Sequence, residues 1–297
     1  MTIQRQNLGI SPIVLVSGCS SGIGLCVVHG LREQGWRVFA TARKESDVIN
    51  LAEQGFESLR LDVSDSSSIA ECVAEVLSRT DGRIDALFNN AGFGVPGAVE
   101  DLSREAMRNQ FETNVFGAIE LSNAVLPTMR QQGYGTLLFN SSVLGFAAMP
   151  YRGAYNASKF ALEGFVDTLR QELCGSQIHA CLIEPGPIES CFRSNAAQQF
   201  LRWIQLEHSF HAKSYALMQQ RLAVVGAAAP FTLPALAVLK VVVAALEAKR
   251  PKPRYRVTTP TKIFWYLKRI LPTRCLDWIL LTASGDEPGA SYGRKRK

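Results

Sequence analysis

A tyrosine and a lysine in the middle of the chain have the types and the spacing of an acid–base pair. Tyr155 and Lys159 are four residues apart, so a helix would place the phenol and the ammonium group on one face. A free phenol has a pKa of about 10, too high for efficient proton exchange at neutral pH. A positive charge about 4 Å away is worth about 4 kcal/mol at an effective dielectric of about 20, which corresponds to about three pKa units. The spacing therefore predicts a phenol tuned to exchange protons near pH 7.

The surroundings of this pair favour a functional site. Ser141 and Ser142 follow a short predicted strand at 136–139, and Tyr155 comes thirteen residues after Ser142. Open α/β sheets bind ligands at the carboxyl ends of their strands, where both serines and the start of the tyrosine helix would lie. The alternative is a pair on a surface helix that has no chemical role.

A glycine-rich segment near the N-terminus has the pattern of a phosphate-binding loop. It runs Gly18-Cys19-Ser20-Ser21-Gly22-Ile23-Gly24, after a β-branched run at 13–16 and before an apolar-periodic stretch at 23–31. Gly18 permits a tight turn, Gly22 lets the backbone approach a pyrophosphate, and Gly24 leaves room where helix meets sheet. The free amides and the positive dipole end of the helix favour phosphate. The context predicts a dinucleotide site; the alternative is a simple strand–helix turn.

The end of the second predicted strand, at 38–40, distinguishes between two cofactors. An NAD site has a carboxylate there that accepts a hydrogen bond from the ribose 2′-hydroxyl. This chain has Ala40-Thr41-Ala42-Arg43-Lys44, and its first acid there is Glu45. A guanidinium at Arg43 would bind a 2′-phosphate that a carboxylate would repel, and Ser20 or Ser21 would add a hydrogen bond. The sequence favours NADP over NAD, unless Arg43 is a solvated loop charge.

Strands and helices alternate through the first 185 residues. Apolar and β-branched runs predict strands at 13–16, 38–40, 59–61, 86–88, 136–139 and 178–183. Periodic segments predict helices at 23–31, from 46, at 66–77 with an Asp/Ser cap, and at 104–111, 113–129 and 155–173. Strands joined by single crossover helices run parallel. We therefore expect a doubly wound, Rossmann-type α/β sheet with helices on both faces.

The pattern changes after residue 185. Residues 187–230 are irregular and amphipathic, without a strand signal, and 233–248 has an apolar helical pattern. No Gly/Ser-rich linker or internal repeat marks a boundary, so we expect a single domain over 1–297 with its core at 13–190. The C-terminal extension, 249–297, is basic and aromatic, and residues 249–274 contain no acid. Residues 249–281 would contact an anionic membrane surface, or pack over the mouth of the site or a partner subunit.

Composition excludes several classes of protein. The chain has 297 residues, of which 47% are apolar and 20% charged, so it is globular. The net charge is +6, but four of these charges lie at 294–297, which argues against a nucleic-acid-binding face. Seven scattered cysteines without a Cys-x-x-Cys pattern argue against disulfides or a metal site and for a reducing compartment. The N-terminus lacks a secretory signal and no apolar run approaches 18 residues, so we expect a cytoplasmic protein, with a membrane surface as the alternative.

Five motifs in this order resemble the short-chain dehydrogenase/reductase superfamily. They are the glycine loop, Asn89-Asn90-Ala91-Gly92 after the fourth strand, Ser142, the Tyr155–Lys159 pair, and Pro185-Gly186 after the sixth strand. The resemblance covers about residues 13–190. Residues 153–164 and 184–188 look most like the branch that contains 17β-hydroxysteroid and retinol dehydrogenases and bacterial NADP-dependent aldehyde reductases.

The resemblance implies a role for each matched residue. Tyr155 would exchange a proton with the substrate oxygen, Lys159 would lower the tyrosine pKa and hold the nicotinamide ribose, and Ser142 would hydrogen-bond the carbonyl. Asn114 would anchor a proton-relay water near the lysine, and Asp62 would contact the adenine. The other expected cofactor contacts are Gly18, Ser20, Ser21, Gly22, Ile23, Gly24, Arg43, Asn90, Gly92, Pro185, Gly186 and Ile188.

These observations predict an NADP(H)-dependent oxidoreductase that moves a hydride between nicotinamide and the carbonyl or alcohol carbon of an apolar aldehyde, retinoid or steroid-like substrate. The family builds its substrate lid from the segment at 187–230, whose aromatic residues would form the lid, the core or a dimer contact. These aromatics are Phe200, Trp203, Phe210 and Tyr215. The resemblance implies a homo-oligomer. The alternative function is a non-catalytic NADP-binding sensor or scaffold, against which the complete Ser/Tyr/Lys/Asn set argues.

Overall fold

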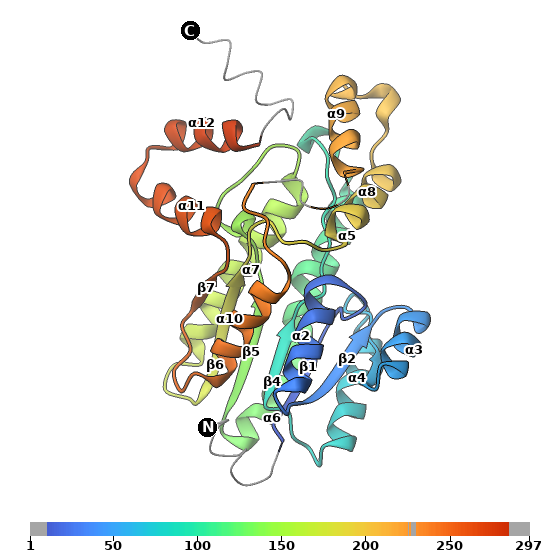
Figure 1. Ribbon diagram of the computed structural model, residues 1–297, viewed down its shortest axis with the longest axis vertical. Coiled ribbons are helices and arrows are strands. Elements are labelled where there is room, and N and C mark those ends of the chain that lie inside the picture. Colours follow the sequence, from blue (N-terminus) through green and yellow to red (C-terminus); the bar gives the residue numbers. More distant parts are fainter. Residues whose placement is uncertain (1–10, 225, 227–229, 285–297) are drawn as a thin grey trace.

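The computed structural model describes residues 11–224, 226 and 230–284, which form one seven-stranded parallel sheet. Its order is β3-β2-β1-β4-β5-β6-β7, so the chain reverses its direction across the sheet between β1 and β4. This arrangement confirms the doubly wound fold (Figure 1). The strands are β1 (Ile13–Val16), β2 (Arg37–Ala42), β3 (Glu57–Arg60), β4 (Ala86–Asn89), β5 (Gly135–Asn140), β6 (Ile178–Glu184) and β7 (Arg254–Arg256).

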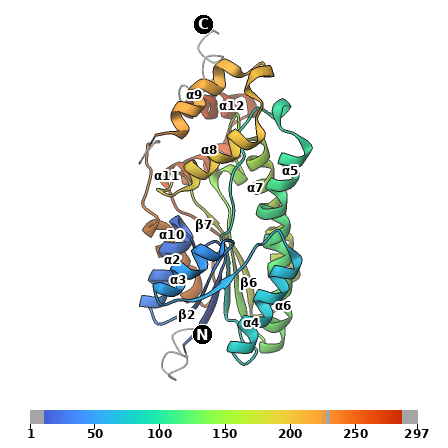
Figure 2. The same ribbon diagram turned by 90° about the vertical axis from the view of Figure 1, so that its right-hand side faces the viewer.

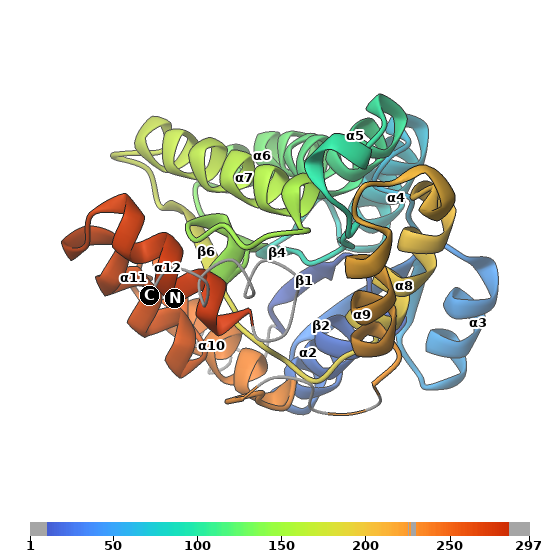
Figure 3. The ribbon, with the colours of Figure 1, turned by 90° about the horizontal axis from the view of Figure 1, so that it is seen from above.

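Helices cover both faces of the sheet, and Figures 2 and 3 show the two layers on either side of it. One face carries α2 (Gly22–Glu33), α3 (Glu45–Glu53) and α10 (Leu236–Glu247). The other carries α4 (Ser66–Arg79), α6 (Ala118–Gln132) and α7 (Gly153–Glu172). Next to α7, α5 (Arg104–Phe111) packs through Ala106 against Ala154. Successive strand side chains point to opposite faces. Leu15 therefore joins the core beneath α4 and α6, whereas Val14 and Val16 join the core beneath α2 and α10.

The remaining elements gather beyond the carboxyl ends of the strands (Figure 1). They are η1 (Val99–Asp101), η2 (Glu112–Gly117), η3 (Val143–Gly145), α8 (Phe192–Trp203), η4 (Leu206–His208), α9 (Ala212–Leu222), α11 (Thr259–Ile270) and α12 (Thr273–Ala283). In the C-terminal extension, Phe264 and Leu267 pack with Leu276 against Val143 and Leu144. The described part of the extension thus covers the strand ends, one of the placements that the sequence left open.

The sequence predicted six strands and missed β7. Arg254, Tyr255 and Arg256 form a strand only three residues long, too short and too polar to give a hydrophobic signal. The strand lies beside β6, so the C-terminal extension completes the sheet. Residues 285–297 of that extension, with its terminal basic cluster, lie outside the described residues. The domain boundaries stay a prediction.

No helix among the described residues combines the length and the apolar character that a bilayer span requires.

Candidate active site

The glycine loop joins β1 to α2 with almost no space for side chains. Gly18 has φ of +71°, and a Cβ there would lie 2.8 Å from the Cα of Ala91. A Cβ on Gly24 would lie 2.2 Å from the carbonyl oxygen of Gly18. The side-chain amide of Asn90 donates to the carbonyl oxygens of Ser17 and Gly18 at 3.0 and 2.9 Å. The loop is therefore held tightly against the segment after β4, with the amino end of α2 directly behind it.

Arg43 and Asp62 lie just beyond the carboxyl ends of β2 and β3. Arg43 is exposed and forms no ion pair with any other described residue. Asp62 is half-buried, and its carboxylate accepts hydrogen bonds from the backbone amide and the hydroxyl of Ser64 at 3.0 and 2.6 Å. The backbone amide of Cys19 donates to the carbonyl of Thr41 at 2.8 Å, which ties the glycine loop to β2.

Ser142, Tyr155 and Lys159 meet at the carboxyl end of β5. The Ser142 hydroxyl hydrogen-bonds the Tyr155 side chain and accepts from the backbone amide of Leu144 at 3.1 Å. Lys159 Nζ donates to the carbonyl oxygen of Asn140 at 2.6 Å and lies 5.7 Å from the centre of the Tyr155 ring. As the four-residue spacing predicts, α7 presents both side chains on the same face.

Asn114 lies in a π-helical turn between α5 and α6. Its Nδ2 donates to the carbonyl of Phe93 at 2.9 Å and to the hydroxyl of Ser158 at 3.2 Å, and its Oδ1 accepts from the amide of Phe93 at 3.1 Å. A Cβ on Gly92 would lie 3.2 Å from Asn114 Oδ1 and 3.8 Å from Lys159 Nζ. Wide turns of this kind occur often at functional sites. This one brings Asn114 to the lysine side of the cluster.

The tyrosine pKa moves in the direction opposite to the predicted one. Burial raises the pKa of Tyr155 to about 12, and the hydrogen bond with Ser142 only partly opposes this rise. Burial also lowers the pKa of Lys159 to about 8, against the favourable charge of Glu163. The attraction between ammonium and phenolate, on which the predicted fall rested, is outweighed by the cost of desolvating the phenolate. At neutral pH Tyr155 is thus a protonated phenol that can donate.

The segment after β6 forms the third side of the site. The carbonyl of Pro185 accepts from the amide of Val143 at 2.8 Å, which joins it to the loop that carries Ser142. A Cβ on Gly186 would lie 2.2 Å from the Oγ1 of Thr258 and 2.9 Å from that of Thr261. Sequence reasoning missed these two buried threonines because they come from the C-terminal extension, outside every recognised motif.

A cleft of about 960 Å³ opens at these residues. The predicted site residues on its wall are Ile23, Asn90, Gly92, Ser142, Tyr155, Lys159, Pro185, Gly186 and Ile188. The other predicted residues lie outside this wall: Gly18, Ser20, Ser21, Gly22, Gly24, Arg43, Asp62 and Asn114.

The rest of the wall is mainly apolar and comes from segments in which the sequence analysis predicted no site residue. It includes Val95, Met149, Phe192, Met218 and Phe264. Three arginines also reach the wall, and none of the described lining residues is acidic; the arginines are Arg152, Arg193 and Arg221.

The aromatic residues singled out in the lid segment are not part of this wall. Phe200 and Tyr215 are 1% and 0% exposed and form a small core between α8 and α9. Trp203 packs with Val95, and Phe210 is 91% exposed. The sequence described residues 187–230 as irregular and therefore missed the helices α8 and α9. Its amphipathic pattern could not distinguish side chains that face the cleft from those that join these helices.

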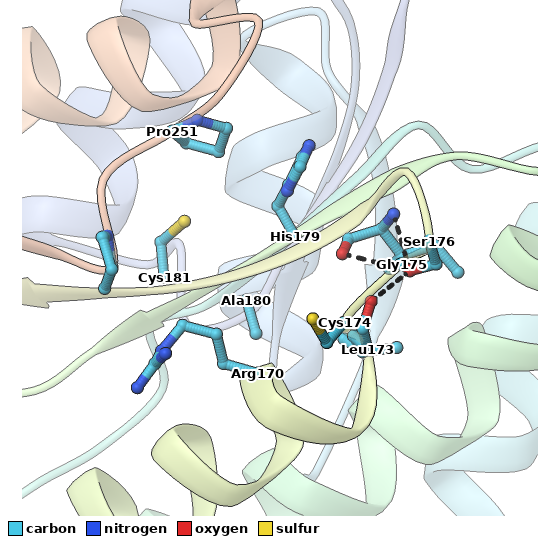
Figure 4. A pocket seen from close by; sticks show the side chains of 11 residues that line it. Arg170, Leu173, Cys174, Gly175, Ser176, His179, Ala180, Cys181 and Pro251 are labelled. Atoms are coloured by element: carbon cyan, nitrogen blue, oxygen red, sulfur yellow. Dashed lines mark hydrogen bonds between the residues drawn. The ribbon is translucent and has the colours of Figure 1, made fainter.

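A second pocket, of about 260 Å³, lies at the opposite end of β6 (Figure 4). Arg170, Cys174, His179 and Cys181 line it together with Pro251. Within the described ranges, no group of three histidine, cysteine or acidic side chains is arranged to hold a metal ion. None of the predicted site residues lines this second pocket, whereas Tyr155 and Lys159 line the larger cleft.

Comparisons with known proteins identify the family. Residues 12–200 match the family model described as short chain dehydrogenase. An uncharacterized oxidoreductase of Escherichia coli, YbbO, is 41% identical over 267 residues, which cover 90% of this chain and 93% of that protein. Human retinol dehydrogenase 8 is 40% identical over 196 residues, which cover 63% of this chain and 62% of that protein.

Solved structures share the fold. A short-chain dehydrogenase/reductase from Burkholderia phymatum in complex with NAD has a TM-score of 0.73 at 21% identity, with 88% of this chain and 92% of that chain covered. A short-chain dehydrogenase from Burkholderia cenocepacia in complex with NADP has a TM-score of 0.70 at 21% identity, covering 91% and 98%. Solved neighbours thus bind either nicotinamide cofactor.

The fold, the glycine loop and the cleft define a class of nucleotide-binding oxidoreductases that act on alcohol or carbonyl groups. Within that class, this chain belongs to the short-chain dehydrogenase/reductase family.

Proposed function

We propose that this chain is an NADP(H)-dependent oxidoreductase that transfers a hydride between nicotinamide and the carbonyl or alcohol carbon of an apolar aldehyde, retinoid or steroid-like substrate. The observation that carries the proposal is the meeting of Ser142, Tyr155 and Lys159 on one cleft, whose wall also holds Asn90, Gly186 and many apolar side chains. The 40% identity to a retinol dehydrogenase supports the apolar substrate class.

The residues present fit a dinucleotide. The loop before α2 has glycines at positions where a Cβ would fill the turn. No side chain caps the amino end of α2, so its first backbone amides are open to a pyrophosphate. The bound cofactor would supply the hydride. Pro185, Gly186 and Ile188 would hold the carboxamide side of its nicotinamide, Asn90 and Gly92 would flank the adenosine, and Asp62 would contact the adenine.

The choice of NADP rests on Arg43. This guanidinium is exposed at the end of β2, where an NAD site has a carboxylate, and it forms no ion pair within the described part of the chain. It is thus available for a 2′-phosphate, with Ser20 or Ser21 as an additional donor.

The proton steps belong to Tyr155 and its two neighbours. In reduction, the protonated Tyr155 donates to the substrate oxygen, while the Ser142 hydroxyl stabilises the negative charge that develops there. The Lys159 ammonium stabilises the resulting phenolate and holds the nicotinamide ribose. Asn114, beside Lys159, anchors the water through which the proton is replaced.

Removal of the phenol hydroxyl tests this assignment. Tyr155→Phe should lower kcat by at least about 10²-fold, since positioned acid–base groups contribute about 10²–10⁴-fold. The Kd for NADPH, measured by fluorescence titration, should stay unchanged. The assay follows NADPH absorbance with a panel of aliphatic aldehydes, retinoids and steroids. Full turnover in the variant would overturn the mechanism. NADPH binding by the unmodified protein without turnover of any compound would favour the sensor or scaffold.

Three finer proposals concern the setting of the enzyme. We place it in the cytoplasm as a homo-oligomer, with peripheral contact to an anionic membrane through residues 249–281. The last point draws support from exposed side chains on α11 and α12: Tyr266, Ile270 and Trp278 are 61%, 74% and 59% exposed.

A further inference from the structure

An ion-pair cluster behind the cleft joins the active-site segments to the C-terminal extension. Glu163 of α7 and Glu184 of β6 are buried, at 8% and 0% exposure, and both face arginines of β7. Arg254 Nε lies 3.1 Å from Glu163 Oε2 and 3.0 Å from Glu184 Oε1. Arg256 Nε lies 3.1 Å from Glu184 Oε2. None of these four residues lines the cleft, so the proposed reaction gives them no role.

Glu163 links this cluster to both catalytic segments. Its Oε1 accepts a hydrogen bond from the Ser141 hydroxyl at 2.5 Å, and Ser141 immediately precedes Ser142. It also follows Lys159 by one helical turn, and its charge favours the ammonium form of that buried lysine. A single carboxylate thus contacts the serine loop and acts on the lysine.

Glu184 brings the nucleotide segment into the same cluster, because it directly precedes Pro185 at the end of β6. Neither of its carboxylate oxygens forms an aligned hydrogen bond within the described residues, and the two arginines are its ionic partners. Burial raises the pKa of Glu184 to about 7, and nearby Glu163 adds to the rise, while Arg256 and Arg254 oppose it. Loss of one arginine would leave the buried Glu184 with a single ionic partner, which is destabilising and raises the pKa of the carboxyl further.

The second arginine connects the cluster to α11. The guanidinium carbon of Arg256 lies 3.8 Å from the centre of the Trp265 ring, and that of Arg269 lies 3.5 Å from the same ring. The position of the C-terminal extension is therefore coupled, through β7, to the segments that carry Ser142, Lys159 and Pro185.

We propose that Glu163 and Arg254 are positioning residues of the reaction: Glu163 keeps Lys159 in its ammonium form and fixes the serine loop, and Arg254 fixes Glu163 when the C-terminal extension is docked. This inference rests on the proposed function, in which Lys159 holds the cofactor.

Several charged groups face Glu163 from the elements around it. Lys159 and Asp167 lie on its own helix, Glu184 on β6, Arg254 on β7 and Lys268 on α11. The Lys159 ammonium is lost as the pH rises through a pKa of about 8. Because a carboxylate favours the ammonium, removing the charge of Glu163 lowers that pKa further. The alkaline limb of cofactor binding and turnover must then move to lower pH.

Glu163→Gln tests this with little change in shape, since the amide oxygen still accepts from Ser141. The pH dependence of kcat/KM and of the NADPH Kd is measured from pH 6 to 10. We expect the alkaline limb to move down by about one unit, so that kcat/KM at pH 8 falls about fivefold. Arg170→Met is the matched control, because Arg170 pairs with Asp167 but contacts neither Glu163 nor Glu184. An alkaline limb in Glu163→Gln that coincides with that of the control would refute the role of Glu163.

Arg254 is tested through its coupling to Glu163. Arg254→Met should lower kcat about tenfold, and combining it with Glu163→Gln should cost much less than the product of the two single effects. Melting temperatures identify variants that fail to fold, and Arg254→Lys, which keeps the charge, should recover part of the loss. Fully multiplicative effects would refute the link. If the alkaline limb of the NADPH Kd moved in Glu163→Gln but the unmodified protein turned over no carbonyl compound, the proposed function alone would be refuted. If the protein turned over a carbonyl compound but that limb did not move, this inference alone would be refuted.

Discussion

Two parts of the molecule place their site residues in different ways. The first half is the nucleotide part, β1 to β6, and the second half is the described part of residues 187–284. In the first half, backbone geometry fixes the residues: Gly24 is required because a carbonyl oxygen stands where its Cβ would lie. In the second half, packing fixes them: Phe200 and Tyr215 hold α8 and α9 together, whereas Phe264 holds α11 against Leu144. Backbone requirements produce short motifs, while many apolar sequences satisfy a packing requirement. The first half would thus set the cofactor and the second the substrate.

The largest effect should come from the small core between α8 and α9. Phe200→Ala removes a 1%-exposed aromatic side chain, a change that costs about 3–5 kcal/mol in a well-packed core. We expect a lower melting temperature and a raised KM for long apolar substrates, because Met218, which lines the cleft, packs in the same cluster. The NADPH Kd should stay within about twofold, since no nucleotide motif touches this cluster.

The control for this variant lies in the same segment. Phe210 is 91% exposed, so Phe210→Ala should change stability by less than about 0.5 kcal/mol. If Phe200→Ala weakened NADPH binding as much as substrate binding, the division of cofactor and substrate binding between the two parts of the chain would be wrong.

How far the sequence predicts the structure follows the same division. Asp65 caps α4 through a hydrogen bond from the Ser67 amide, as predicted, because a cap is a local interaction. Glu163 and Glu184 lie inside recognised motifs, yet nothing in the sequence marked them. Their partner, Arg254, is 91 residues from Glu163 along the chain. The tyrosine pKa direction was wrong for a related reason, since burial is a property of the whole fold.

A smaller effect is expected at the glycine loop. Gly24→Ala places a methyl group 2.2 Å from the carbonyl oxygen of Gly18, so the backbone must shift. Overpacking of this kind costs about 1–3 kcal/mol, and we expect the NADPH Kd to rise about tenfold to a hundredfold. The KM for substrate at saturating NADPH should change little.

Gly164→Ala is the matched control, because a Cβ there meets nothing within 4 Å. Its exposed position in α7 should make the variant as stable as the original chain or more stable by up to about 1 kcal/mol. Unchanged NADPH affinity in Gly24→Ala would contradict the assignment of the loop to phosphate.

The smallest effect is expected at Arg43, the one proposed nucleotide contact that depends on charge alone. Arg43→Asp places a carboxylate beside the ribose of the cofactor. This carboxylate would repel the 2′-phosphate of NADPH and accept a hydrogen bond from the 2′-hydroxyl of NADH. We expect kcat/KM for NADPH to fall about tenfold, with kcat/KM for NADH unchanged or raised, since one exposed charge-assisted contact is worth about 1–2 kcal/mol. Stability should not change, because Arg43 is exposed and pairs with no acid in the described chain.

Arg60→Asp is the control, an equal change of charge at the exposed end of the neighbouring strand β3. It distinguishes a specific contact with the cofactor from the general electrostatic attraction of the strand ends. Equal losses in both variants would mean that the strand ends attract the cofactor only by net charge, and that the preference for NADP arises elsewhere in the cleft.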